Sequence, residues 1–334
     1  MHIKLYIIMN KIDLRRAALF ITVIFLSSVA VFSLSMSLSY VMKLTKQVTV
    51  QTETPKYHVA IYLPETTHSF FNLMLKGAED FCEKEKIALS VHTFDESSNQ
   101  LFAAPYMGAD GIVIYSFSDT KETAEVLDKI TDSSTPLVLI DHAIITNKPY
   151  THIGVNNFEL GCFIGDYLFK EQTLIYPLIV YSEKSPGMYA ERELIEMGLK
   201  STASYKLEES ILCAVTTQNM LDAEEIVSSL LSTNPRTNTI IFTNEDDTLA
   251  YAKMLVEQNK VGTRRIIGFG SSEAVKDYLD KGVLDALISV DSYQLGYQAL
   301  QSIYETCQNG YTSSYVNTGF NFLKQTNKDG DMPK

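Results

Sequence analysis

From Tyr57 onward, short runs of Val, Ile and Leu alternate with stretches of helical periodicity. The apolar runs read HVAIYL, IALSVHT, GIVIYS, PLVLID, PLIVYS, SILCAV, NTIIFT, RRIIGFG and DALISV. These runs lack polar alternation, which is typical of strands covered on both faces. Strand–helix–strand alternation predicts parallel sheets with right-handed crossovers. The pattern covers more chain than one domain of roughly 100–200 residues holds, so we expect two Rossmann-like α/β lobes.

The N-terminal region has a different composition. Residues 17–42 contain no charged side chain, and about 20 such residues span a bilayer. Basic residues outnumber acidic ones before this segment: Lys4, Lys11, Arg15 and Arg16 stand against Asp13. This excess favours a cytoplasmic N-terminus.

We therefore predict a single-pass protein of the cell membrane with an extracytoplasmic ligand-binding domain. Residues 1–16 form the cytoplasmic N-terminus, residues 17–42 the transmembrane anchor and residues 43–56 a polar tether. The alternative is a cleaved signal peptide, with Ser28–Ala30 as the small-residue cleavage site.

Charge and motifs exclude several classes of function. The net charge is -12, and Lys and Arg form no cluster beyond the first 16 residues, which argues against nucleic acid as a partner. The chain has no G-x-S-x-G, Walker A or H-E-x-x-H motif, and its four cysteines include no C-x-x-C spacing. We therefore expect no catalytic residues, no metal and no cofactor. A metal-assisted hydrolase using Asp141, His142 and His68 is a minor alternative.

Hydrogen-bonding and aromatic side chains, rather than small turn residues, follow several apolar runs. They are His68, Phe70 and Phe71 after HVAIYL, Asp141 and His142 after PLVLID, Asn244 after NTIIFT, and Asp291 after DALISV. In open α/β sheets, ligands bind beyond the carboxyl ends of the strands. Sugars suit this set, because their hydroxyls pair with amides and carboxylates and their C–H faces pack on rings. The structural alternative is that the rings pack against the next helix, that Asp141 caps a turn and that Asn244 and Asp246 cap the helix that follows them.

A series of segments also resembles one known family in order along residues 57–324. The segments are HSFFNLMLKGAEDF, ADGIVIYSFSD, PLVLIDH, HIGVNNFELGCFIGDYL, IIFTNEDDTLAYAKML, RIIGFGSSEAV and ISVDSYQLGYQAL. Together they resemble the type I periplasmic sugar-binding proteins, which include the ribose- and galactose-binding proteins and the ligand-binding domain of lactose-repressor-like regulators.

The resemblance implies two lobes that are joined by three crossovers and close over a ligand like a hinge. It places residues 57–152 and 291–319 in the N-terminal lobe, and residues 153–290 and 320–326 in the C-terminal lobe. It also implies ligand contacts from His68, Phe70, Phe71, Asp141, His142 and Asn244.

The chain departs from the family pattern on the C-terminal lobe. Gly270 stands where the family has a cleft Asp, and Val290 stands where it has a Gln, although Asp291 is adjacent. The cleft Arg of the family falls at Ile195, one helical turn after Arg192. We therefore include Arg192 and Asp291 among the candidate ligand-binding residues and expect an unusual ligand.

The anchor and the resemblance together predict a membrane-anchored sugar sensor. A monosaccharide would close the cleft, and a membrane partner such as a sensor histidine kinase would respond to the closed form. The alternative is the substrate-binding subunit of an ABC sugar importer, with an ABC permease as its partner.

Overall fold

The structure is a computed structural model of the 334-residue chain. It describes residues 22–39, 55–64, 69–94, 99–115, 120–171, 174–203, 211–217, 219 and 222–325. The chain forms two separate compact units, Met1–Pro55 and Lys56–Lys334, and each is treated by itself below.

In the first unit, Thr22–Ser39 forms one helix of 18 residues. Its large apolar side chains are exposed, and those of Phe25, Leu26 and Phe32 are 67% exposed each. By length and composition this helix can cross a membrane, and a signal sequence has the same properties. The rest of the predicted anchor lies outside the described residues.

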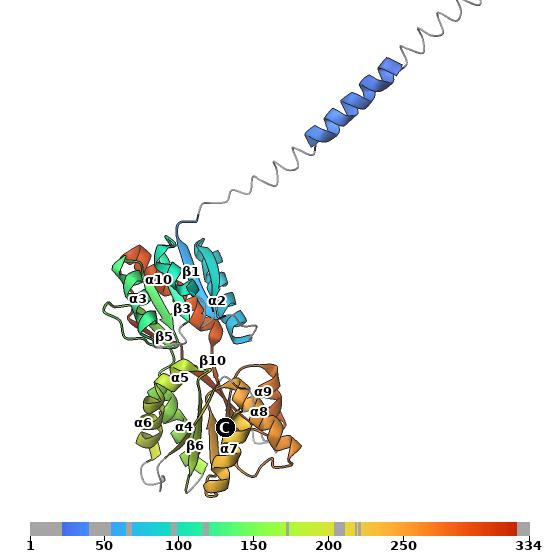
Figure 1. Cartoon of the computed structure of the whole chain (residues 1–334). Coiled ribbons are helices and arrows are strands. Elements are labelled where there is room, and N and C mark those ends of the chain that lie inside the picture. Colours follow the sequence, from blue (N-terminus) through green and yellow to red (C-terminus); the bar gives the residue numbers. More distant parts are fainter. Residues whose placement is uncertain are drawn as a thin grey trace, which may run out of the picture. The chain divides into compact units, whose positions relative to one another are not determined.

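The second unit begins with an α/β lobe around a six-stranded sheet of order β11-β5-β4-β3-β1-β2, in which every pairing is parallel. Its strands are β1 (His58–Pro64), β2 (Ala88–Phe94), β3 (Gly111–Tyr115), β4 (Leu137–Ile140), β5 (Thr151–Gly154) and β11 (Tyr315–Asn317). Its helices are α2 (Ser69–Glu85), the 3₁₀ segment η1 (Asn99–Tyr106), α3 (Lys121–Asp132) and α10 (Ser292–Asn309). In Figure 1, α10 packs beside α2, although the two helices lie far apart in the sequence.

A second six-stranded sheet has the order β12-β10-β9-β8-β6-β7, with only β12 antiparallel. Its strands are β6 (Pro177–Ser182), β7 (Leu212–Thr216), β8 (Thr239–Phe242), β9 (Arg265–Phe269), β10 (Ala286–Val290) and β12 (Phe320–Lys324). Its helices are α4 (Asn157–Glu171), α5 (Pro186–Ala190), α6 (Arg192–Ala203), α7 (Asp222–Thr233), α8 (Glu245–Glu257) and α9 (Glu273–Asp280). The prediction of two mostly parallel α/β lobes is confirmed.

Both sheets are covered on both faces, as the unbroken apolar runs predict. In the first lobe, all five residues of β3 are buried. Val113 packs in a core cluster with Met74 of α2, while Ile114 packs in the opposite cluster with Leu127 of α3. Successive side chains of β3 thus point to opposite faces of the sheet and pack in two different cores, so this strand is covered on both faces.

The chain passes between the sheets after β5, after β10 and between β11 and β12. Two of these crossings are hydrogen-bonded to each other. The Thr318 N–H donates to the Gly154 carbonyl at 3.0 Å, and the Asn156 N–H donates to the Asn317 side-chain oxygen at 3.3 Å. Paired crossings of this kind form the hinge expected between two α/β lobes.

Candidate functional site

The carboxyl ends of the two sheets meet at Asp141 and Gly187. Asp141 directly follows β4 in the first lobe, and Gly187 lies in α5, just after β6 of the second. The Gly187 backbone lies close to the Asp141 carboxylate and helps to stabilise its charge. A Cβ atom on Gly187 would lie 2.6 Å from the Asp141 carbonyl oxygen and 2.7 Å from its carboxyl carbon, so glycine permits this approach. Ligands of open α/β sheets bind at this edge.

Three aromatic rings stand beside Asp141. Phe70 and Phe71 lie in the first turn of α2, with ring centroids 5.2 Å apart and edge-to-face. Tyr115, at the end of β3, meets Phe71 edge-to-face at 4.9 Å and Phe70 at 6.1 Å. The Tyr115 hydroxyl donates to Asp141 Oδ2 at 3.0 Å. Phe70 and Phe71 are only half-buried, so ring surface remains for the C–H face of a ligand.

Asp141 has an unusual backbone and an unusual acidity. Its φ of 69° lies in the left-handed region, which Asp and Asn adopt more readily than most residues. Burial raises the pKa of the Asp141 carboxyl. The Tyr115 hydrogen bond, the charge of His152, the Gly187 N–H and the charge of His142 oppose this shift without cancelling it. His142 is itself 5% exposed. The first lobe thus presents a carboxyl group, rings and an imidazole together.

On the second lobe, Asn244 connects two strand ends. It is the N-cap of α8, and its side-chain oxygen accepts hydrogen bonds from the N–H groups of Asp246 and Asp247. Its Nδ2 donates to the Ser185 hydroxyl at 3.1 Å. Ser185 stands two residues before Gly187, so Asn244 lies on the side of the second lobe that meets Asp141. The capping role that the sequence left open is therefore present.

Two other predicted site residues, Arg192 and Asp291, have their contacts outside this group. Arg192 opens α6, where its guanidinium lies 4.9 Å from the Tyr189 ring and donates to the Tyr189 carbonyl at 2.9 Å. Asp291 caps α10 by accepting the Gln294 N–H at 3.1 Å. Neither contacts the aromatic rings or Asp141 in the hydrogen bonds and ring contacts of the described residues. His68 lies outside the described residues.

Three contributors to this edge were missed at the sequence level: Tyr115, Gly187 and Glu245. Tyr115 closes a buried apolar run and looks like an ordinary core residue. Gly187 gives no signal until its contact with the other lobe is known. The carboxylate of Glu245 lies against Gly270.

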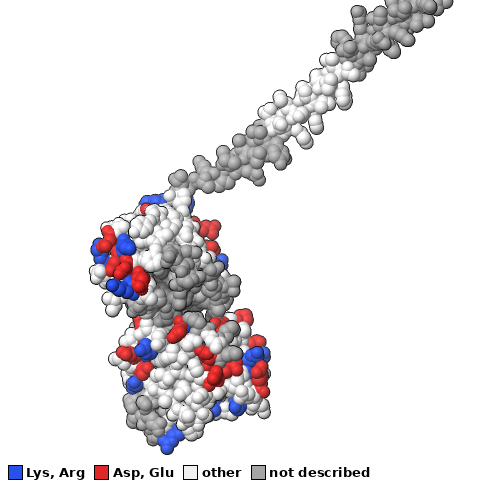
Figure 2. Space-filling view, viewed as in Figure 1, with Lys and Arg blue, Asp and Glu red and all other residues white. Residues whose placement is uncertain are grey.

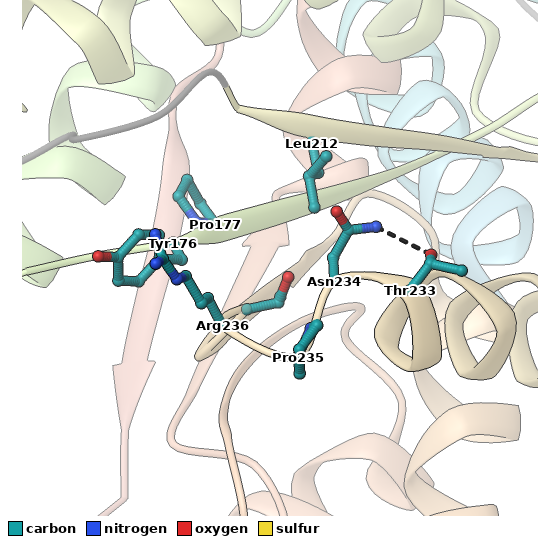
Figure 3. Close-up of a pocket in the computed structure, with 8 residues that line it drawn as sticks. Tyr176, Pro177, Leu212, Thr233, Asn234, Pro235 and Arg236 are labelled. Atoms are coloured by element: carbon teal, nitrogen blue, oxygen red, sulfur yellow. Dashed lines mark hydrogen bonds between the residues drawn. The ribbon is translucent and has the colours of Figure 1, made fainter.

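A hollow at the other end of the second sheet is not part of this site. Figure 3 shows it between Tyr176 and Pro177 at the start of β6, Leu212 at the start of β7, and the loop that follows α7. Its volume is about 190 Å³. Within it, Asn234 Nδ2 donates to the Thr233 hydroxyl at 3.1 Å. Because the hollow lies at the amino ends of these strands, the rule for ligands in open α/β sheets does not apply to it.

The described surface also carries information about partners. Figure 2 shows Lys and Arg mixed with Asp and Glu on both lobes, with no basic stripe on the face in view. Such mixing does not produce the field that attracts a phosphate backbone. Within the described residues, no three His, Cys, Asp or Glu side chains are grouped to hold a metal ion.

Three solved structures share this fold at low sequence identity. The first is GanP, a glucose-galactose binding protein from Geobacillus stearothermophilus (TM-score 0.70, 21% identity, 82% of this chain and 99% of that one covered). The second is an ABC transporter solute-binding protein from Agrobacterium vitis bound with alpha-D-tagatopyranose (0.68, 22%, 82% and 97%). The third is the Caulobacter myo-inositol binding protein bound to myo-inositol (0.69, 16%, 80% and 93%).

A comparison with curated protein sequences gives no match. The family model of the periplasmic binding protein domain matches residues 59–310, which is most of the second unit and includes every described candidate residue. The family consists of binding proteins rather than enzymes, in agreement with the missing catalytic motifs. By this match the chain belongs to the periplasmic binding protein family, and it shares the fold of the solved sugar-binding proteins.

Proposed function

We propose that the chain is a membrane-anchored extracytoplasmic protein that closes on a single sugar and reports the closed state to a membrane partner. The observation that carries the sugar-binding part is the group formed by Phe70, Phe71, Tyr115 and Asp141, which faces Gly187 of the other lobe. A carboxylate next to aromatic rings recognises hydroxyls and a C–H face at once. The structural neighbours are named for glucose and galactose, tagatopyranose and myo-inositol, so the ligand we propose is a monosaccharide or cyclic polyol.

Contact between the lobes supports a mechanism of closure. Asp141 belongs to the first lobe but lies directly against Gly187 of the second. A sugar held between these elements contacts both lobes only in the closed form, so it binds that form more tightly and shifts the population toward it. A partner that distinguishes the two forms changes the apparent sugar affinity reciprocally.

The proposed membrane localisation rests on the N-terminal apolar helix. Thr22–Ser39 is long and apolar enough to span a membrane, and the family is extracytoplasmic. The test is the N-terminal mass of the mature protein together with its partition after alkaline extraction of membranes. An intact N-terminus in the membrane fraction supports an anchor. A shortened chain in the soluble fraction supports a signal peptide.

The experiment for sugar binding is a thermal-shift screen with D-glucose, D-galactose, D-tagatose and myo-inositol. A ligand at one hundred times its dissociation constant stabilises the fold by about 2.7 kcal/mol. We expect at least one sugar to raise the melting temperature, and we expect Phe71→Ala and Asp141→Ala to abolish that rise. If both variants keep the full shift, the sugar binds elsewhere.

The second candidate is the substrate-binding subunit of an ABC sugar importer. The name of the Agrobacterium vitis neighbour as an ABC transporter solute-binding protein favours it. Crosslinking in native membranes with and without sugar, followed by mass spectrometry, separates the two. A sensor histidine kinase captured in a sugar-dependent way supports sensing, and a permease supports import.

A further inference from the structure

The carboxylate of Glu245 occupies the space that a side chain at residue 270 would need. Glu245 is the first residue of α8 and is 7% exposed. A Cβ atom on Gly270 would lie 2.5 Å from Glu245 Cγ and 2.7 Å from its Cδ. The φ of Gly270 is +138°, which L side chains rarely adopt. Residue 270 is thus glycine for two reasons: its backbone angle disfavours other residues, and the Glu245 carboxylate leaves no space for a side chain.

This carboxylate lies at the edge of the second lobe that faces Asp141. Strands β8 and β9 are parallel, so their carboxyl ends, which precede Glu245 and Gly270, share one edge of the sheet. Asn244, next to Glu245, bonds to Ser185, and Ser185 lies two residues before the contact with Asp141. Glu245 therefore belongs to the strand ends that form the second-lobe side of the cleft.

The hydrogen bonds of Glu245 use one of its two oxygens. Oε2 accepts the Ser271 N–H at 2.7 Å and the Ser272 N–H at 3.4 Å. Among the described residues, no hydrogen bond to Oε1 is formed. A carboxylate has acceptor sites on both oxygens, and Oε1 is not among the buried unpaired side-chain atoms of the described residues. Oε1 is therefore accessible and can accept a hydrogen bond from a ligand hydroxyl.

We propose that Glu245 is the sugar-binding carboxylate of the second lobe and that it replaces the aspartate that the family pattern places at residue 270. This inference rests on the proposed sugar-binding function. Carboxylates on both sides of the cleft, Asp141 and Glu245, accept hydroxyl hydrogen bonds and repel anions. The ligand class is therefore neutral sugars and polyols, with sugar acids excluded.

The test uses the full-length chain in detergent and isothermal titration with D-glucose, D-galactose, D-tagatose and myo-inositol. The central variant is Glu245→Gln. Its amide oxygen still accepts the Ser271 N–H, while its NH₂ group turns the second acceptor into a donor. We expect binding of the best sugar to weaken by roughly tenfold or more. The matched control is Glu273→Gln, because the Glu273 side chain is 94% exposed, and it should bind like wild type.

A second readout separates a ligand contact from a merely structural role. D-glucuronate should bind wild type far more weakly than D-glucose, and Glu245→Gln should narrow this ratio by removing one negative charge. If Glu245→Gln does not fold, the shorter carboxylate of Glu245→Asp is titrated instead and judged by the same loss of binding.

The outcomes distinguish this inference from the proposed function. Sugar binding that falls in Asp141→Asn but is unchanged in the folded Glu245 variant overturns only the role of Glu245. Sugar binding that is unchanged in Asp141→Asn and lost in Glu245→Gln supports Glu245 and contradicts the first-lobe wall. No binding of any of the four sugars by wild type overturns both proposals.

Discussion

Gly187 of the second lobe lies so close to Asp141 that a Cβ atom on it would be 2.7 Å from the Asp141 carboxyl carbon, and Tyr115 donates to the same carboxylate from within the first lobe. One side chain thus belongs to the aromatic wall and to the contact between lobes. Asp141 also has a left-handed backbone, φ 69°, which directs a residue at a strand end away from the path of the strand. The carboxyl group that we propose for ligand binding is therefore also the one at the contact between the lobes.

We first predict that Gly187→Ala weakens sugar binding without unfolding either lobe. The added methyl group would lie 2.6 Å from the Asp141 carbonyl oxygen, so the lobes must separate at this point. We expect about tenfold weaker binding, equivalent to about 1.4 kcal/mol, and a larger radius of gyration by small-angle scattering in saturating sugar. Glu183→Ala, an exposed change in the same loop, is the control. An unchanged radius together with unchanged affinity would show that the contact is dispensable.

The second prediction concerns pH. Burial raises the folded-state pKa of Asp141 above its unfolded value of about 3.9. Between these two pKa values the folded chain holds more protons than the unfolded chain, so this residue's contribution to stability falls as the pH rises through that window. Asp141→Asn removes the titration, and Asn also tolerates a positive φ. We expect the variant to gain in melting temperature over wild type from acidic to neutral pH.

The measurement is the melting temperature of both proteins from about pH 3.5, below the unfolded pKa, to pH 7. Asp277→Asn, whose side chain is 67% exposed in wild type, is the control and should give a flat difference. A flat or falling difference for Asp141→Asn would mean that the buried carboxyl does not cost stability. Sugar binding by Asp141→Asn should weaken most above the raised pKa of Asp141, because only there does wild type carry the carboxylate acceptor that the variant lacks.

The fold was predictable because its signal is local. An all-buried strand such as Gly111–Tyr115 must have apolar residues on both faces, and that pattern is visible in the sequence without knowing its neighbours. The helix starts were equally local, since Asn244 and Asp291 cap the helices that follow them. The chemistry of the site was less accessible.

Tyr115 illustrates why. Its hydroxyl reaches Asp141 because β3 and β4 pair with Tyr115 opposite Ile140, the residue before Asp141. The register between two strands that are separated by a helix depends on the packing of the whole lobe. It therefore cannot be predicted from the sequence around either residue. The same holds for Gly270 and Glu245, where the sequence indicates a missing carboxylate but not the one that fills its place. The roles of Phe70, Phe71 and Asp141 in binding stay predictions.

The third prediction distinguishes the role of the aromatic ring of Phe71 in sugar binding from its role as an apolar side chain in packing. Phe71→Leu keeps an apolar side chain, so we expect a loss of about 1 kcal/mol in the free energy of unfolding, mostly from the ring pairs with Phe70 and Tyr115. Sugar binding should fall by roughly tenfold or more, because Leu offers no flat face. Chemical denaturation and titration calorimetry measure the two effects.

Phe102→Leu is the matched control for Phe71→Leu, since Phe102 is 42% exposed in the 3₁₀ segment η1 and is not part of the aromatic group. It should leave sugar affinity unchanged. Equal affinity losses in both variants would attribute the effect of Phe71→Leu to a general loosening of the first lobe.

The last prediction concerns a buried ion pair beneath the strand ends of the second lobe. Lys184 Nζ lies 2.6 Å from Asp247 Oδ1, with side chains 10% and 0% exposed. The Thr216 hydroxyl donates to the other oxygen of Asp247 at 2.5 Å. Removing one partner leaves a buried charge unpaired, so Lys184→Met should lower the free energy of unfolding by about 3–5 kcal/mol. Adding Asp247→Leu should recover part of this loss, because the uncompensated charge is then gone.

An exposed ion pair on the same helix serves as the reference for the strength of the buried pair. Lys253 and Glu257 lie on α8, the helix of Asp247, with side chains 66% and 64% exposed and 3.8 Å between charged atoms. Breaking that pair should cost under about 1 kcal/mol, as for surface pairs in general. Guanidinium denaturation of the single and double variants gives both coupling energies. If the two coupling energies are equal, burial does not strengthen the Lys184–Asp247 pair. A larger coupling energy for Lys184 and Asp247 would mean that burial strengthens this ion pair. The pair would then help to fix the position of Asn244 and Glu245.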